Sequence, residues 1–141
     1  MKILLAVDGS KNSLDAVSSL VRHVSWFREP PTVHLVTVHL PVPTVGAFGG
    51  PSKKALDKYY REEGEQNLAK AKKLLEKAGL PYEDEILVGP VAETLCKLAA
   101  DGNADLICMG TRGLGAAAGF LMGSVATKVL HGAKVPVLLV K

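Results

Sequence analysis

The chain has 141 residues, of which 48% are hydrophobic, 22% charged and 5% aromatic, and its net charge is +3. This length suits one domain, spanning 1–141, that buries about 70% of its unfolded surface. The charge is too dispersed and the aromatic residues too few for a nucleic-acid-binding surface. The apolar run before Asp8 is too short for a signal peptide or a membrane span. We therefore predict a cytoplasmic protein that binds neither nucleic acid nor membrane.

The first elements along the chain are a strand, a helix and a second strand. Residues 2–7 form a continuous apolar run ended by the sequence DGS, which is typical of a strand buried on both faces. Ser10 is placed to cap a helix whose apolar residues recur every three or four positions before Pro30. The β-branched residues of 32–40 predict a strand, and the prolines and glycines of 41–52 predict a mobile loop.

The rest of the chain alternates helices with strands. A long charged helix is expected over 53–78, and an interruption at Gly64 is left open because glycine is a poor helix former. Pro90 suits the first turn of a later helix that closes at Gly102. The remaining elements are expected as strand 82–89, helix 90–102, strand 104–110, helix 123–133 and strand 135–140.

Strict alternation of buried strands and helices predicts an α/β fold, with a parallel sheet covered by helices on both faces. Ligands bind such sheets outside the carboxyl ends of the strands, where the strand order reverses. Asp8 follows the first strand and Gly110 ends the fourth. The two residues share this crevice if their strands are neighbours.

A cluster of five glycines lies between residues 110 and 123, directly before a helix that starts near Ser124. The unpaired N–H groups of a helix start attract anions, and glycine lets phosphate oxygens approach the backbone. Arg112 adds a fixed positive charge. These parts suit two or three linked phosphates, although glycines also serve in linkers or where a helix packs closely on a sheet.

Two phosphate-binding motifs fit this stretch poorly. No lysine precedes Ser124, so the chain lacks a P-loop. The segment GLGAAA matches GxGxxA, but it follows the fourth strand and lacks an acidic residue about 20 positions further on. A dinucleotide site is therefore the weaker alternative.

The spacing Gly110-x2-Gly113-x9-Gly123-Ser124 resembles the ATP-binding signature of the universal stress protein family. The segments KILLAVDGS, ADLICMGTRG and VPVLLVK also look like this family, so the resemblance covers the whole chain. It implies a single doubly wound five-stranded parallel sheet of order 3-2-1-4-5, a stress-response role, and a homodimer. It also implies ATP, or ADP or AMP, as the ligand, together with Mg.

The resemblance further implies the residues of a nucleotide site. Gly110, Gly113, Gly123 and Ser124 would receive the phosphates, with Arg112 and Val125 adjacent. Asp8 would lie near the ribose and the metal-phosphate end, with Ala6 beside it. The backbone of Val38 would meet the adenine, and Met109 would pack near the sugar and base. The residues between Gly115 and Gly119 are smaller and less charged than the family pattern, which bears on whether this loop closes over the nucleotide.

No catalytic residue is assigned. Efficient ATP hydrolysis needs a positioned water, and the motif contains no obvious glutamate or glutamine to position it. Ser124 has no evident histidine-carboxylate pair to activate it, and His39 is interpreted as structural. We favour a regulatory nucleotide-binding protein with slow or absent hydrolysis. The alternatives are an ATPase or phosphotransferase, and an interaction module without nucleotide.

Three further residues complete the sequence-based expectations. Pro136 confines the last strand to an edge of the sheet, and this apolar edge predicts a homodimer that pairs from Val135 to Val140. Cys96 and Cys108 lack the spacing of a metal or redox motif and are expected to be buried, reduced thiols.

Overall fold

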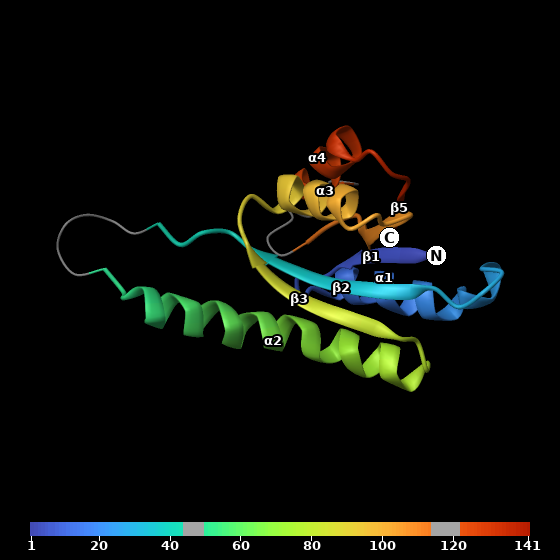
Figure 1. The fold of residues 1–141 in the computed structure, drawn as a ribbon, viewed down its shortest axis with the longest axis horizontal. Coiled ribbons are helices and arrows are strands. Elements are labelled where there is room, and N and C mark those ends of the chain that lie inside the picture. The colour runs from blue at the N-terminus through green and yellow to red at the C-terminus, as the bar shows by residue number, and fades with distance from the viewer. Residues whose placement is uncertain (44–49, 114–121) are drawn as a thin grey trace.

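The computed structural model describes residues 1–43, 50–113 and 122–141. Most of the predicted loop 41–52 and the stretch from Gly115 to Gly119 lie outside the described residues. The elements in chain order are β1 (Lys2–Ala6), α1 (Lys11–Arg22), the 3-10 turn η1 (Val24–Trp26), β2 (Thr32–His39), α2 (Lys53–Lys77), β3 (Tyr82–Val88), α3 (Val91–Asp101), β4 (Leu106–Gly110), α4 (Ser124–Gly132) and β5 (Val137–Val140) (Figure 1).

The five strands form one parallel sheet of order β3-β2-β1-β4-β5, which confirms the predicted topology. β1 lies between β2 and β4, with Leu5 opposite Leu35 on one side and Cys108 on the other. The chain thus winds outward from β1 in both directions. The strand order reverses between β1 and β4, which brings Asp8 and Gly110 to the same edge of the sheet.

Helices cover both faces of the sheet (Figure 1). Successive residues of a strand point to opposite faces, so Leu4 and Leu5 enter different cores. The core under α1 and α2 includes Leu5, Val17, Leu35, Leu68 and Leu75. The core under α3 and α4 includes Leu4, Val36, Leu95, Ile107 and Val129. Burying each of these side chains stabilises the fold by about 1.5–3 kcal/mol.

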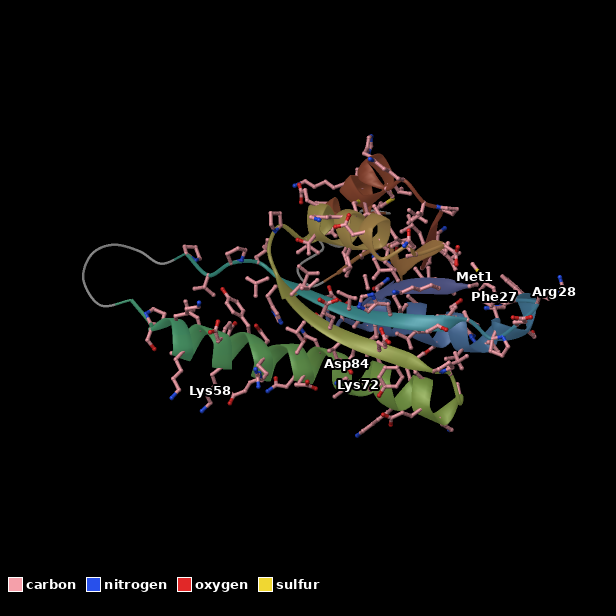
Figure 2. All side chains as sticks on the ribbon, in the orientation of Figure 1. Met1, Phe27, Arg28, Lys58, Lys72 and Asp84 are labelled. Carbon is pink, nitrogen blue, oxygen red and sulfur yellow. The ribbon has the colours of Figure 1, made fainter. Side chains whose placement is uncertain are left out.

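The long helix α2 continues unbroken through Gly64, which is buried and faces the sheet. A Cβ at Gly64 would lie 2.6 Å from Cγ2 of Ile86 on β3. The glycine therefore serves close packing between α2 and the sheet and does not interrupt the helix. On the outer surface Lys72 of α2 reaches Asp84 of β3 at 2.8 Å, and charged side chains follow the whole helix (Figure 2).

The helix starts differ in detail from the sequence-based expectation. Ser10 caps α1 as predicted and accepts a hydrogen bond from Ser13 N at 3.2 Å. Pro90 has extended backbone and precedes α3 as its N-cap instead of lying in the first turn. At α4 the N-cap is Gly123 and the helix begins at Ser124, one residue after the expected start.

The two cysteines lie in different environments. Cys108 is fully buried in β4, and this burial raises the pKa of its thiol to about 12. Cys96 is only partly buried, so the prediction of two buried thiols is wrong for this residue. Its burial still raises the thiol pKa, and Sγ donates a weak hydrogen bond to the Val129 carbonyl at 3.8 Å. No helix in the described part of the chain is long and apolar enough to cross a membrane.

Candidate ligand-binding site

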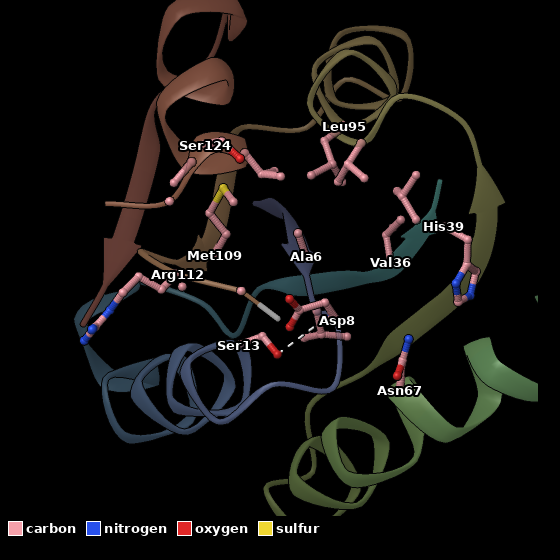
Figure 3. Close-up of a pocket in the computed structure, with 18 of the residues that line it drawn as sticks. Ala6, Asp8, Ser13, Val36, His39, Asn67, Leu95, Met109, Arg112 and Ser124 are labelled. Carbon is pink, nitrogen blue, oxygen red and sulfur yellow. Dashed lines mark hydrogen bonds between the residues drawn. The ribbon is translucent and has the colours of Figure 1, made fainter. Parts of the chain in front are cut away.

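A pocket with a volume of about 380 Å³ opens at the carboxyl ends of β1, β2 and β4 (Figure 3). Its walls also include the starts of α1 and α4, the first turns of α3 and the middle of α2. All ten residues of the predicted nucleotide site line it: Ala6, Asp8, Val38, Met109, Gly110, Arg112, Gly113, Gly123, Ser124 and Val125. The fold thus gathers residues that are far apart in the sequence around one cavity.

Asp8 is held in place by the turn that joins β1 to α1. Its Oδ1 accepts a hydrogen bond from Ser10 N at 3.0 Å, and its backbone N–H donates to Ser13 Oγ at 3.3 Å (Figure 3). Such side-chain bonds to the backbone two residues on are typical of an Asx turn. Asp8 is therefore a turn residue and a pocket residue at once.

The three glycines of the motif lack a side chain for different reasons. A Cβ at Gly110 would lie 2.8 Å from the Asn12 carbonyl oxygen, so this glycine lets the start of α1 pack on β4. A Cβ at Gly113 would collide with Oδ2 of Asp8. A Cβ at Gly123 would make ordinary contacts, the nearest at 3.4 Å, and its φ of −79° is open to any residue. Packing within the described chain therefore explains why a side chain is absent at Gly110 and Gly113, but it does not explain the absence at Gly123.

The start of α4 offers hydrogen-bond donors to the pocket. The N–H groups of Ser124, Val125 and Ala126 precede the first intrahelical bond, which runs from Thr127 N to Gly123 O at 3.0 Å. Gly123 N is already bonded to Thr111 O at 2.7 Å. Gly123 thus contributes open space and the next three residues contribute donors, an arrangement suited to an anion.

Arg112 lines the pocket, but its charged end does not face the start of α4. Figure 3 shows the guanidinium turned away from both Asp8 and Ser124. Within the part of the chain that the structure describes, its Nε is buried without a hydrogen-bond partner. The positive charge expected beside the glycines is therefore directed elsewhere in this conformation.

The other end of the pocket contains residues that the sequence analysis did not assign to the site. Val91 and Leu95 of α3 join Val38 as apolar walls, while Glu63 and Asn67 of α2 supply polar groups. Residues four apart share one face of a helix, so Glu63 and Asn67 could have been paired from the sequence. Which strand end this face meets is decided by the packing of α2 on β2 and β3.

His39 also lines this far end, on β2, and its Nδ1 lies 3.4 Å from Oε2 of Glu63. The pocket therefore does hold a histidine-carboxylate pair, which the sequence did not reveal. Figure 3 shows His39 and Ser124 at opposite ends of the pocket, so this pair does not adjoin Ser124 as a base would adjoin its nucleophile. Among the described residues no group of three His, Cys, Asp or Glu side chains could hold a metal ion.

Comparison with known proteins identifies relatives over the full chain. The model of the universal stress protein family matches residues 1–141. Universal stress protein MJ0531 of Methanocaldococcus jannaschii is 36% identical over 141 residues, which cover 99% of this chain and 81% of the relative. The solved structure of hypothetical protein MJ0577 is similar with a TM-score of 0.80 and 27% identity, covering 99% of this chain and 94% of that one. A universal stress protein in complex with cAMP gives a TM-score of 0.70 and 26% identity, covering 100% and 97%.

Proposed function

Because the chain belongs to the universal stress protein family, we propose that it binds an adenine nucleotide in the pocket at the carboxyl ends of β1 and β4. The preferred ligand is ATP, with ADP or AMP as alternatives. The bound nucleotide regulates a stress response, hydrolysis is slow or absent, and the working form is a homodimer.

The observation that carries this proposal is the division of the pocket into two unlike ends. The glycines and the start of α4 form a polar end with backbone donors. The other end, called the apolar end below, has apolar walls from Val38, Val91 and Leu95 that suit a flat aromatic ring, and it carries polar side chains only from His39, Glu63 and Asn67 among its described lining residues. The volume of about 380 Å³ is in the usual range for small-molecule sites. The similar universal stress protein in complex with cAMP supports an adenine nucleotide as the ligand.

The phosphates fit the polar end of the pocket. The N–H groups of Ser124, Val125 and Ala126 donate to phosphate oxygens, and the absent side chain of Gly123 leaves room for them. Magnesium commonly takes one or two protein carboxylates together with phosphate oxygens and water. Asp8 supplies one carboxylate next to Gly113, so the residues present fit a nucleotide-bound Mg ion.

The same geometry supports binding without efficient hydrolysis. Hydrolysis requires a group that orients water against the terminal phosphate. Two carboxylates line the pocket among the described residues: Asp8, whose Oδ1 accepts from Ser10 N, and Glu63, which lies by His39 at the far end. If Asp8 nevertheless acts as such a group, ATP turnover will be measurable and will vanish in an Asp8→Ala variant, which would make the protein an ATPase.

The thermal unfolding midpoint with and without Mg-ATP tests the binding proposal. A hundredfold excess of ligand over Kd adds about 2.7 kcal/mol of stability, which raises the midpoint of a domain of this size by several degrees. The matched control is Gly123→Val, which fills the space beside Thr111 and Arg112. A rise of the unfolding midpoint in the parent, without a rise in Gly123→Val, supports the proposal. No rise with protein freed of copurified nucleotide would contradict it and favour an interaction module.

The homodimer is proposed to form through the segment from Val135 to Val140, which contains β5. This edge strand is apolar and Leu138 is 38% exposed, whereas the opposite edge strand, β3, carries Glu83 and Asp84 as exposed charges. Charged edge strands resist pairing with another chain, so β5 is the edge left to be covered. A Leu138→Lys variant should be monomeric by light scattering; an unchanged dimer would count against this interface.

A further inference from the structure

The apolar end of the pocket contains a buried hydrogen-bonding group without a partner. His39 is 9% exposed, and its Nε2 has no hydrogen-bond partner in the part of the chain that the structure describes. Buried polar groups are nearly always paired, and exceptions call for an explanation. Because His39 also lines the pocket, a bound ligand can supply the missing partner.

The neighbours of His39 determine which hydrogen-bonding role Nε2 plays. A carboxylate only accepts hydrogen bonds, so Glu63 at 3.4 Å places the proton of a neutral imidazole on Nδ1. Nε2 is then an acceptor. The Tyr59 hydroxyl also donates a hydrogen bond to the Glu63 carboxylate, which raises the pKa of Tyr59. The Tyr60 ring lies against the imidazole with centroids 5.8 Å apart.

We propose that His39 is the residue that selects the base, by accepting a hydrogen bond at Nε2 from the exocyclic amino group of a 6-aminopurine. This inference rests on the proposed function. Phosphates at the start of α4 leave the base to extend toward the opposite end of the pocket, between the side chains of Val38, Val91 and Leu95. Figure 3 shows His39 and Asn67 on the wall that closes this end.

A 6-oxopurine carries a carbonyl oxygen at the position where the 6-aminopurine donates to His39 Nε2. Its carbonyl oxygen is an acceptor and would face the lone pair of Nε2, so neither atom would gain a partner. A binding site that relies on one buried hydrogen bond rejects an analogue that cannot form this bond, because the buried group of the protein then has no partner. We expect AMP to bind at least about tenfold more tightly than IMP.

Calorimetric titration of AMP and IMP into the full chain tests the inference. In a His39→Phe variant, which keeps a flat ring of similar size, the ratio of the two dissociation constants should fall from about tenfold to about one. The matched control is His34→Phe. His34 lies on the same strand and pairs with Glu85 at 3.0 Å, but it does not line the pocket, so the ratio should stay at the parent value.

The possible results separate this inference from the proposed function. A parent that binds AMP and IMP equally well overturns the role of His39, as does an unchanged ratio in His39→Phe. A parent that binds none of AMP, IMP and Mg-ATP overturns the proposed function itself. If His39→Phe does not fold, Glu63→Gln replaces it: the amide no longer fixes the proton on Nδ1, so the preference for AMP should shrink, and an unchanged preference overturns the inference.

Discussion

Alanine substitution is expected to destabilise the protein at Gly110 and to leave its stability nearly unchanged at Gly123, although both glycines belong to the same motif. A Cβ at Gly110 would lie 2.8 Å from O and 2.9 Å from C of Asn12. These are backbone atoms of the first turn of α1, so they cannot rotate away and α1 must shift from β4. Overpacking of this kind costs about 1–3 kcal/mol.

At Gly123 the added methyl group meets nothing closer than 3.4 Å, and the backbone conformation suits alanine. Replacing glycine lowers the entropy of the unfolded chain and contributes about 0.4–1 kcal/mol to stability. Alanine is a poorer N-cap than glycine by a similar amount, so the two effects nearly cancel. We expect Gly123→Ala to change the free energy of unfolding by no more than about 0.5 kcal/mol.

Urea unfolding of the parent and both variants measures the difference, provided that the m-values agree. Gly110→Ala should lose at least about 1 kcal/mol more than Gly123→Ala. If Gly110→Ala is as stable as the parent, or if Gly123→Ala is the more destabilised of the two, the assignment of one glycine to packing and the other to open ligand space is wrong.

Three further predictions concern single side chains. Cys108 should resist thiol reagents at pH 8 in the folded protein, because it is fully buried and its pKa is raised to about 12; rapid labelling without denaturant would contradict this. Ser10→Ala should cost about 1 kcal/mol in urea unfolding, since it removes the side-chain acceptor of Ser13 N; no loss would show that the cap is dispensable. Ultraviolet titration should place the pKa of Tyr59 above its ordinary value in the parent, because the hydrogen bond to Glu63 raises it. The pKa of Tyr59 should be lower in Glu63→Gln. Equal pKa values in the two proteins would show that Tyr59 does not interact with Glu63.

The fold was predictable because its central strands β1 and β4 are buried on both faces. The segments ending at Asp8 and at Gly110 are apolar runs bounded by turn residues, and helical spacing of apolar residues lies between such runs. Alternation then leaves few arrangements for a parallel sheet. The edge position of β5 followed from Pro136, which cannot donate a hydrogen bond within a ladder.

The remaining features depend on tertiary contacts that no local pattern encodes. Gly64 was considered as a break in α2, but its role follows from the Ile86 side chain on a distant strand. The direction of the Arg112 guanidinium, away from Asp8 and Ser124, likewise does not follow from the motif. Glu63 and His39 are 24 positions apart and meet only because α2 lies along β2. A histidine at a strand end therefore could not be paired with its carboxylate from the sequence.

The most direct test of a nucleotide-binding pocket is a two-dimensional 1H–15N NMR titration of the labelled chain with Mg-ATP. If phosphates bind at the start of α4, the amide resonances of Gly113, Ser124, Val125 and Ala126 should shift most, as expected for donors of new charge-assisted hydrogen bonds. The same titration of Gly123→Ala, a folded control, should leave these resonances unmoved at equal nucleotide concentration. Shifts elsewhere with these four amides unchanged would contradict the account.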